Sequence, residues 1–260
     1  MLLIDGMREV LYQVVQTYYK SNNVNPSVLE LGVHQGANAV NLYNIFKPGK
    51  LDLVDSWDAG VISDAYSPGN PDVFWVDGLE ARANYYGGDI QNQHTLDNNM
   101  KLCQQKVSDF ERVNVIKSKS IDYLKQCAEN NHRYDVIYVD GSHDYEDVLV
   151  DLMWASKISE PNGWILLNDC CHSQGGVKQN LGVLEACIKF CKMENYVPVL
   201  VARSDWTDVA LTRINQRQIE DFFIRVLIQS DIGFCQVPSS LLPHSKVVNG
   251  KRHANFLFGY

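Results

Sequence analysis

Short apolar runs alternate along most of the chain with stretches in which apolar residues recur every three or four positions. The first pattern is typical of strands in a sheet and the second of amphipathic helices. The predicted strands are residues 28–31, 50–54, 113–117, 134–139, 164–167, 196–202 and 207–214. The predicted helices are an N-terminal helix capped by Asp5, residues 38–46, 95–110, 121–127, 145–157 and 177–193, and one in the tail built on Ile219, Phe223 and Leu227.

Strands and helices that alternate over this length predict a parallel sheet with right-handed crossovers. Only residues 203–206 separate the last two predicted strands, which indicates an antiparallel hairpin at the sheet edge. We therefore expect an α/β fold with a doubly wound, seven-stranded, mostly parallel sheet and an antiparallel closing hairpin. A chain of 260 residues suits a single domain, residues 1–260, with a C-terminal extension at 215–260 whose last part the pattern does not assign.

Regular periodicity fades within residues 57–92. This segment contains Ser67-Pro68-Gly69 and many aromatic residues. Long irregular insertions in compact domains are usually functional lids or disordered, and the aromatic content favours an ordered lid. Within it, Tyr85 and Tyr86 either line an acceptor pocket or are ordinary loop aromatics.

Composition narrows the possible partners. Hydrophobic residues make up 45% of the chain and charged residues 21%, as in ordinary globular proteins, and the net charge is -8. This balance argues against nonspecific nucleic-acid binding, although it is compatible with a local basic patch. The seven cysteines lack paired zinc-type spacing and are expected to be reduced thiols. Without a long apolar run, we expect a cytoplasmic protein with no signal peptide and no membrane span.

The turn after the first predicted strand reads Glu30-Leu-Gly32-Val-His34-Gln-Gly36. Glycines at this place suit a tight turn and close backbone approach to a ligand, although many plain strand-to-helix turns share the spacing. Glu30 is expected to point into the crevice above the sheet, and Asp55, at the end of the second strand, is placed to bind a ribose. Because the turn departs from Gly-x-Gly-x-x-Gly, a nucleoside without phosphates is favoured over a dinucleotide.

This combination of residues resembles the first two motifs of the class I S-adenosylmethionine-dependent methyltransferases. The resemblance implies that Gly32 lies against the cofactor, that Glu30 lies near its methionine end and that Asp55 holds its ribose hydroxyls. The further cofactor contacts that it implies are His34, Gly36, Ser56, Trp57, Ser118, Ser120 and Asp140. From the residues alone, Trp57 packs on the adenine, anchors the lid or belongs to the core, and His34 contacts the cofactor or solvent.

Asp140 and Asp169 each end a separate predicted strand. In a parallel sheet both carboxylates therefore rise at the same edge, near Glu30 and Asp55. Two carboxylates suit a hard divalent ion such as Mg²⁺, which can bind an acceptor hydroxyl and lower its pKa. In the alternative interpretation each aspartate only caps the helix that follows it.

The segment from Asp140-Gly-Ser-His143 to Asn168-Asp169 extends the resemblance. It is similar to the methyltransferase group that contains macrolide-sugar O-methyltransferases and cephalosporin hydroxylase-like proteins (methyltransferase family 24-like), and more distantly to catechol O-methyltransferase. The catechol enzyme holds its metal with one acid after the fourth strand and an Asp-Asn pair after the fifth. The resemblance therefore implies metal ligands at Asp140, Asp169 and position 170. Cys170 stands where that Asn would be, and Asn168 and His172 are the substitutes.

His143 is the candidate general base, because its imidazole lies three residues after Asp140 and has an ordinary pKa near working pH. It alternatively caps the helix or bonds to Asp169, and His172 is a second candidate base. The catechol enzyme uses a lysine nearby, and no lysine lies between Asp140 and Val150.

The expected function is S-adenosylmethionine-dependent methyl transfer to a hydroxyl of a small molecule, a sugar or a phenol, with Mg²⁺ or a similar divalent ion as helper. N-methyl transfer, a hydroxylase-like reaction and a non-catalytic protein on the same fold are the alternatives. A dinucleotide oxidoreductase is disfavoured by the glycine spacing. The expected partner is the small-molecule acceptor, with no nucleic acid and no membrane, and a homo-oligomer is left open.

Overall fold

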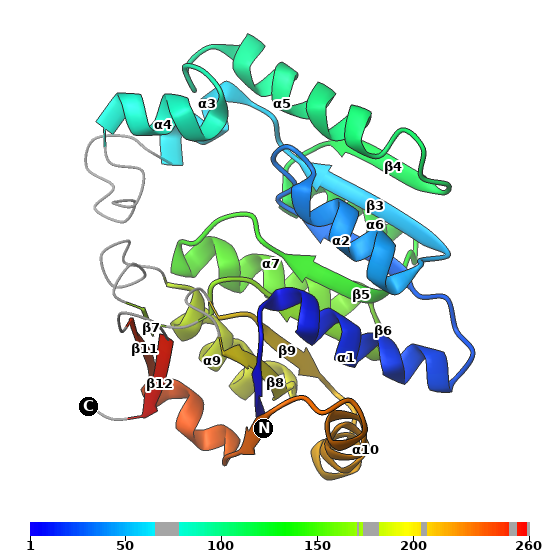
Figure 1. The fold of residues 1–260 in the computed structure, drawn as a ribbon. Helices are drawn as coiled ribbons and strands as arrows, with labels where there is room; N and C mark the ends of the chain where they lie inside the picture. Colours follow the sequence, from blue (N-terminus) through cyan, green and yellow to red (C-terminus); the bar gives the residue numbers. More distant parts are fainter. Residues whose placement is uncertain (66–77, 171, 174–181, 204–206, 250–253, 259–260) are drawn as a thin grey trace.

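A nine-stranded sheet forms the centre of the molecule (Figure 1). The fold is seen in a computed structural model that describes residues 1–65, 78–170, 172–173, 182–203, 207–249 and 254–258. The strands of this sheet are β1 (Leu2–Asp5), β2 (Ser27–Leu31), β3 (Lys50–Asp55), β4 (Val113–Lys117), β5 (Tyr134–Val139), β6 (Ser159–Leu167), β8 (Val197–Arg203), β9 (Val209–Thr212) and β10 (Phe234–Gln236). Their spatial order is β10-β1-β8-β9-β6-β5-β2-β3-β4.

The parallel block runs from β6 through β5, β2 and β3 to β4. β9 pairs antiparallel with β6 and with β8, which confirms the mostly parallel sheet and its antiparallel hairpin. The strand count and the place of the hairpin were predicted wrongly, because β1 and β10 lie beyond β8. Both strands are short, and a strand of four or three residues gives too few alternations to be separated from its neighbours in the sequence.

Helices cover both faces of the sheet. One core contains α1 (Arg8–Ser21), α2 (Ala37–Phe46), α5 (Gln93–Lys106) and α10 (Gln216–Gln229). The other contains α6 (Ser120–Glu129), α7 (Tyr145–Ile158) and α9 (Val183–Glu194). In β5, Val136 and Tyr138 join the first core while Ile137 and Val139 join the second, as the alternation of side chains along a strand requires.

Several predicted boundaries move. Asp5 ends β1 and does not cap a helix, since α1 begins at Arg8 after Met7. The predicted lid contains two helices, α3 (Ala59–Ala65) and α4 (Gly78–Tyr86), and its middle, residues 66–77, lies outside the described residues, as does the start of the helix predicted from residue 177. β6 begins five residues earlier than predicted and passes the Pro-Asn-Gly turn through a register shift against β5.

The last part of the C-terminal extension, which the sequence pattern left unassigned, adds a short 3₁₀ helix, η1 (Ser239–His244), and two strands of a second, three-stranded sheet. This sheet consists of β7 (His172–Ser173), β11 (Ser245–Asn249) and β12 (Ala254–Phe258), with β11 parallel to β7. Because β7 closely follows Asp169, the extension holds the chain directly beyond the candidate site. Within the described part of the chain, no helix combines the length and apolarity needed to cross a membrane.

Candidate functional site

The carboxyl ends of β2, β3, β5 and β6 carry the acidic residues singled out by the sequence. Glu30 lies in β2, Asp55 ends β3, Asp140 follows β5 and Asp169 follows β6. The negative charges of Asp140 and Asp55 act on the Glu30 carboxyl, and that of Asp169 acts on the Asp140 carboxyl. The structure therefore brings the predicted acidic residues to one edge of the sheet, where open α/β sheets bind ligands.

Chain packing already requires the first glycine of the turn. Gly32 has a φ of +84°, and a Cβ there would lie 1.9 Å from the backbone oxygen of Asp140. Gly36, with a φ of +76°, faces Cys103 on α5 in a similar way at 3.0 Å. The two glycines thus let the loop after β2 pass close to the loop after β5 and to α5.

Asp55 binds the same turn from the neighbouring strand. Its Oδ2 accepts hydrogen bonds from the backbone N–H groups of Val33 and His34 at 2.9 and 2.8 Å, and its Oδ1 accepts one from Trp57 at 2.9 Å. The Trp57 ring is buried, and its Nε1 donates to the carbonyl of His34 at 2.8 Å. Asp55 therefore organises the turn, and Trp57 packs as a core residue, the third of its predicted roles.

We expect the Asp55→Asn variant to be less stable than the wild type without any ligand, by about 2–4 kcal/mol, because charge-assisted bonds to three backbone amides are weakened or lost. Denaturant unfolding of the ligand-free protein measures this loss. Asp221→Asn, on the exposed side of α10, is the matched control and should change stability little. If ligand-free Asp55→Asn is as stable as the wild type, Asp55 does not stabilise the turn, and only its predicted role in binding a ribose is left.

Glu30 is a buried carboxyl group with one unused oxygen. Its Oε1 accepts a hydrogen bond from Asn38 Nδ2 at 2.9 Å, and Asn38 Oδ1 in turn accepts one from the Tyr12 hydroxyl at 3.1 Å. Its Oε2 is buried and has no hydrogen-bond partner among the described residues. Burial raises the pKa of Glu30 to about 8, although the bond from Asn38 opposes the shift. A buried acceptor of this kind suits a cationic donor from a ligand.

The lid returns over the glycine turn through α4. The ring of Tyr85 stacks on the His34 imidazole with centroids 4.9 Å apart, and Tyr86 packs edge-on against it at 5.2 Å. His34 has a φ of +52°, and its Nε2 is buried without a hydrogen-bond partner in the described residues. Burial lowers the pKa of this imidazole. The tyrosine pair and His34 therefore join the lid to the turn, a contact that the sequence did not predict.

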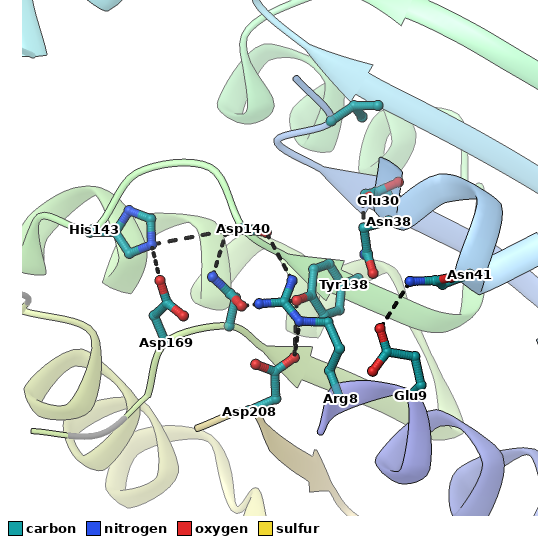
Figure 2. Close-up of polar contacts among 12 residues, drawn as sticks. Arg8, Glu9, Glu30, Asn38, Asn41, Tyr138, Asp140, His143, Asp169 and Asp208 are labelled. Atoms are coloured by element: carbon teal, nitrogen blue, oxygen red, sulfur yellow. Dashed lines mark hydrogen bonds and ion pairs between the residues drawn. The ribbon is translucent and has the colours of Figure 1, made fainter. Parts of the chain in front are cut away.

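His143 lies between the two aspartates at the ends of β5 and β6 (Figure 2). Its Nε2 is 3.2 Å from Asp169 Oδ2 and 3.9 Å from Asp140 Oδ1. Burial alone would lower the pKa of His143, but the hydrogen bond to Asp169 and the charges of both aspartates outweigh it and raise the pKa. Burial raises the pKa of Asp140 to about 7, with His143 opposing and Asp169 reinforcing the shift. The group thus holds an imidazole whose proton affinity is increased by a carboxylate.

Arg8 and Asp208 complete the cluster, and neither was predicted from the sequence. Arg8, the first residue of α1, extends between Asp140 and Asp208 (Figure 2). Its Nη1 lies 3.8 Å from Asp140 Oδ2 and its Nε 3.7 Å from Asp208 Oδ2. Asp208 is buried, and burial raises its pKa to about 8 although Arg8 opposes the shift. The sequence did offer one signal, since Asp208 lies inside the apolar pattern of a predicted strand. A carboxylate buried in this way requires a partner.

Two further polar side chains fill the space beside these charges. Asn168 Nδ2 donates to Asp140 Oδ1 at 2.8 Å. The Tyr138 hydroxyl lies 3.0 Å from both Asn168 Oδ1 and Asp208 Oδ2. Asn168 was predicted from the sequence as a substitute metal ligand. Both its amide nitrogen and its amide oxygen have partners within the protein.

The predicted metal ligands do not fit a metal site. The Cys170 thiol is buried in the second core against that of Cys187 on α9, away from the carboxylates, so its prediction as the third ligand was wrong. Asp140 faces an amide N–H group on one oxygen and a guanidinium on the other. In the parts of the chain that are described, no group of three His, Cys, Asp or Glu side chains has the arrangement to hold a metal ion. The side chain of His172, the other substitute, lies outside the described residues.

The remaining predicted cofactor contacts bond within the protein. Ser120 Oγ donates to Asp151 on α7 at 2.7 Å, and burial raises the pKa of Asp151 to about 6. Ser118 Oγ donates to the carbonyl of Lys119, and its backbone N–H to that of Asp55. Ser56 is partly exposed next to Asp55. Their predicted roles toward a cofactor remain predictions.

A known protein family matches the segment that carries most of the site residues, but not Arg8 or Asp208. Residues 29–170, more than half of the chain, match a protein-family profile described as a methyltransferase domain. The chain belongs to this methyltransferase family. The match spans Glu30, Asp55, Asp140, His143 and Asp169, whereas Arg8 and Asp208 lie outside it. A search of curated protein sequences gives no match.

Solved methyltransferase structures resemble the fold of this family member. A protein assigned as a caffeoyl-CoA O-methyltransferase from Staphylococcus aureus is 12% identical over 78% of this chain and 83% of its own, with a TM-score of 0.50. An O-methyltransferase from Bacillus cereus in complex with SAH is 14% identical over 78% and 80%, with a TM-score of 0.49. The N-methyltransferase NodS from Bradyrhizobium japonicum is 12% identical over 78% and 93%, with a TM-score of 0.46. Of these three, the first shows that the fold is shared.

Proposed function

We propose that this methyltransferase transfers the methyl group of S-adenosylmethionine to a hydroxyl of a small molecule, such as a sugar or a phenol, with His143 as general base. The observation that carries the proposal is the 3.2 Å contact between His143 Nε2 and Asp169 Oδ2. An Nε2–H that donates to Asp169 leaves Nδ1 as the acceptor for a proton. The His143 side chain is 27% exposed, so an acceptor can reach the imidazole.

A hydroxyl is favoured over an amine because of this base. A hydroxyl is a weak nucleophile until its proton is removed, whereas a neutral amine has a free electron pair. His143 would take the hydroxyl proton on Nδ1 as the acceptor oxygen bonds to the methyl carbon that the cofactor supplies, and the electron pair of the carbon–sulfur bond would remain on sulfur. Asp169 stabilises the imidazolium that forms, as the carboxylate does in other His–Asp pairs.

Glu30 is the residue that would hold the methionine end of the cofactor. Its unpaired, buried Oε2 fits the ammonium of that end, and the turn that follows is held by Asp55. When bound, S-adenosylmethionine supplies a methyl carbon activated by the sulfonium. The proposed reaction needs no metal ion, because both oxygens of Asp140 already face N–H groups, from Asn168 and from Arg8.

Calorimetric titration with S-adenosylmethionine, with NAD as the control ligand, tests the cofactor assignment. We expect saturable binding of S-adenosylmethionine and none of NAD. Formation of S-adenosylhomocysteine with a panel of sugars, phenols and amines then tests the acceptor class. Turnover restricted to amines would overturn the hydroxyl assignment, and absence of cofactor binding would favour a non-catalytic protein on this fold.

We expect cofactor binding at pH 7 to release nearly one proton. Free Glu30, with a pKa of about 8, is mostly protonated at pH 7, and pairing with an ammonium lowers its pKa and ionises it. Binding should therefore tighten as the pH rises from 6 towards 8. Calorimetry in buffers of different ionisation enthalpy measures the released proton, and binding without proton release would contradict the role of Glu30.

A further inference from the structure

Arg8 lies between the carboxylates of Asp140 and Asp208. Its guanidinium lies within 3.8 Å of Asp140 Oδ2 and 3.7 Å of Asp208 Oδ2. The Arg8 side chain is 27% exposed and that of Asp140 is 23% exposed, so the pair borders the accessible side of the site. Asp208 is 1% exposed and lies behind them.

The atoms around Asp140 are arranged for hydrogen-bond donors. Asn168 presents its amide N–H group to Oδ1 at 2.8 Å, and Arg8 faces Oδ2. His143 Nε2 approaches Oδ1 at 3.9 Å from the side of Asp169. A hard cation requires bare oxygen ligands, and here both oxygens of Asp140 face N–H groups instead.

The position of Arg8 is set by several contacts of α1. Glu9 accepts a hydrogen bond from Asn41 on α2 at 3.0 Å, and Tyr12 donates to Asn38 on the same helix at 3.1 Å. β1 precedes α1 and pairs with β8 inside the sheet, which holds the start of the helix next to the site. The guanidinium also lies 6.0 Å from the centre of the Tyr138 ring. Arg8 is therefore held by packed elements on both sides of the helix start.

We infer that Arg8 supplies the positive charge of this active site in place of a divalent ion, and that it is a positioning residue that holds the Asp140 carboxylate beside His143. This inference rests on the proposed methyl transfer. It goes beyond it because both Arg8 and Asp208 lie outside the segment matched by the family. Methyl transfer by this chain is then independent of metal ions.

Metal binding is tested directly, without turnover. Mn²⁺ is titrated into the wild-type protein, with and without S-adenosylmethionine, and bound ion is followed by electron paramagnetic resonance. We expect no bound Mn²⁺ at the site and no effect of a chelator on turnover. One bound Mn²⁺ per chain with turnover lost in chelator would overturn the inference. Cofactor binding is measured on the same samples by calorimetry, so that a failure of the proposed function is seen separately from a failure of the metal assignment.

The role of Arg8 is tested with Arg8→Ala, Arg8→Lys and added guanidinium ion. We expect Arg8→Ala to lower turnover about 100-fold, because Asp140 and the acceptor are misplaced by a fraction of an ångström to an ångström. Guanidinium at millimolar concentration should raise the turnover of Arg8→Ala at least about tenfold. Arg8→Lys should retain more activity than Arg8→Ala. Arg225→Ala, exposed on α10, is the matched control and should show neither loss nor guanidinium effect.

Thermal unfolding separates misfolding from lost positioning. If Arg8→Ala does not fold, Arg8→Lys carries the test, since it keeps the charge and should stay folded with measurable turnover. Full activity of Arg8→Ala would overturn the inference. So would a folded Arg8→Ala protein that guanidinium does not rescue and that Arg8→Lys does not surpass.

Discussion

The His143→Ala variant is expected to lose about 100- to 10,000-fold in turnover and to bind S-adenosylmethionine as the wild type does. The loss follows from removal of the group that takes the acceptor proton, while Glu30 and the glycine turn are untouched. Steady-state kinetics measures the turnover and calorimetry the cofactor affinity. His132→Ala, an exposed histidine after α6, is the matched control and should leave both unchanged.

A pH profile of turnover distinguishes a base from a helix cap. The wild-type rate should fall as the pH drops through the raised pKa of His143, since the protonated imidazole cannot accept a proton. Asp169→Asn removes the carboxylate that raises this pKa and leaves the lowering effect of burial, so the acid limb should move to lower pH while the maximal rate falls. An acid limb that does not move would contradict the pairing of His143 with Asp169. Full turnover in His143→Ala would contradict the base assignment itself.

The Glu30→Gln variant is expected to bind S-adenosylmethionine at least about 30-fold more weakly and to fold with a stability at neutral pH no lower than that of the wild type. Glutamine reproduces the shape of the protonated carboxyl and keeps the acceptor for Asn38, but it cannot pair with an ammonium. A buried hydrogen-bonded charge pair that loses one partner costs about 2–5 kcal/mol of binding. Calorimetry measures the affinity, and Glu129→Gln, exposed at the end of α6, is the control.

Stability as a function of pH gives this variant a second signature. The pKa of Glu30 is about 8 in the folded protein and an ordinary 4.5 in the unfolded chain, so the folded state holds its proton more tightly. The contribution of this proton to the free energy of unfolding of the wild type is fully present below pH 4.5. It declines as the pH rises towards 8. Glutamine does not titrate, so the variant should gain stability relative to the wild type over that range. Equal pH dependence of the two proteins would contradict the burial of an unpaired Glu30.

Sequence periodicity predicted much of the scaffold, because strands and helices are encoded by spacings of two and of three to four residues. The five strands of the parallel block were predicted, although β6 begins five residues earlier than expected, and each predicted acid lies at the carboxyl end of its strand. The family was also predicted, from the Glu30 turn, Asp55 and the Asp140 and Asp169 segments, and the family match confirms it. These features are local in sequence, which is why the sequence sufficed.

The chemical identity of the site depended on contacts between distant segments. Arg8 meets Asp140 and Asp208 across more than a hundred residues, and no spacing rule connects them. The direction of the Cys170 side chain was equally hidden, since one step along the chain separates a residue that faces the site from one that faces the core. The lid contact of Tyr85 with His34 joins α4 to the glycine turn in the same way.

The sequence by itself determined which strands form the parallel sheet, where it carries acids and to which family the chain belongs. The tertiary structure alone decided that a guanidinium lies among those acids, that Cys170 faces away from them and that His143 lies against Asp169. The physical reason is that local spacing sets backbone conformation, whereas the partner of a buried charge is set by which elements the folded core brings together.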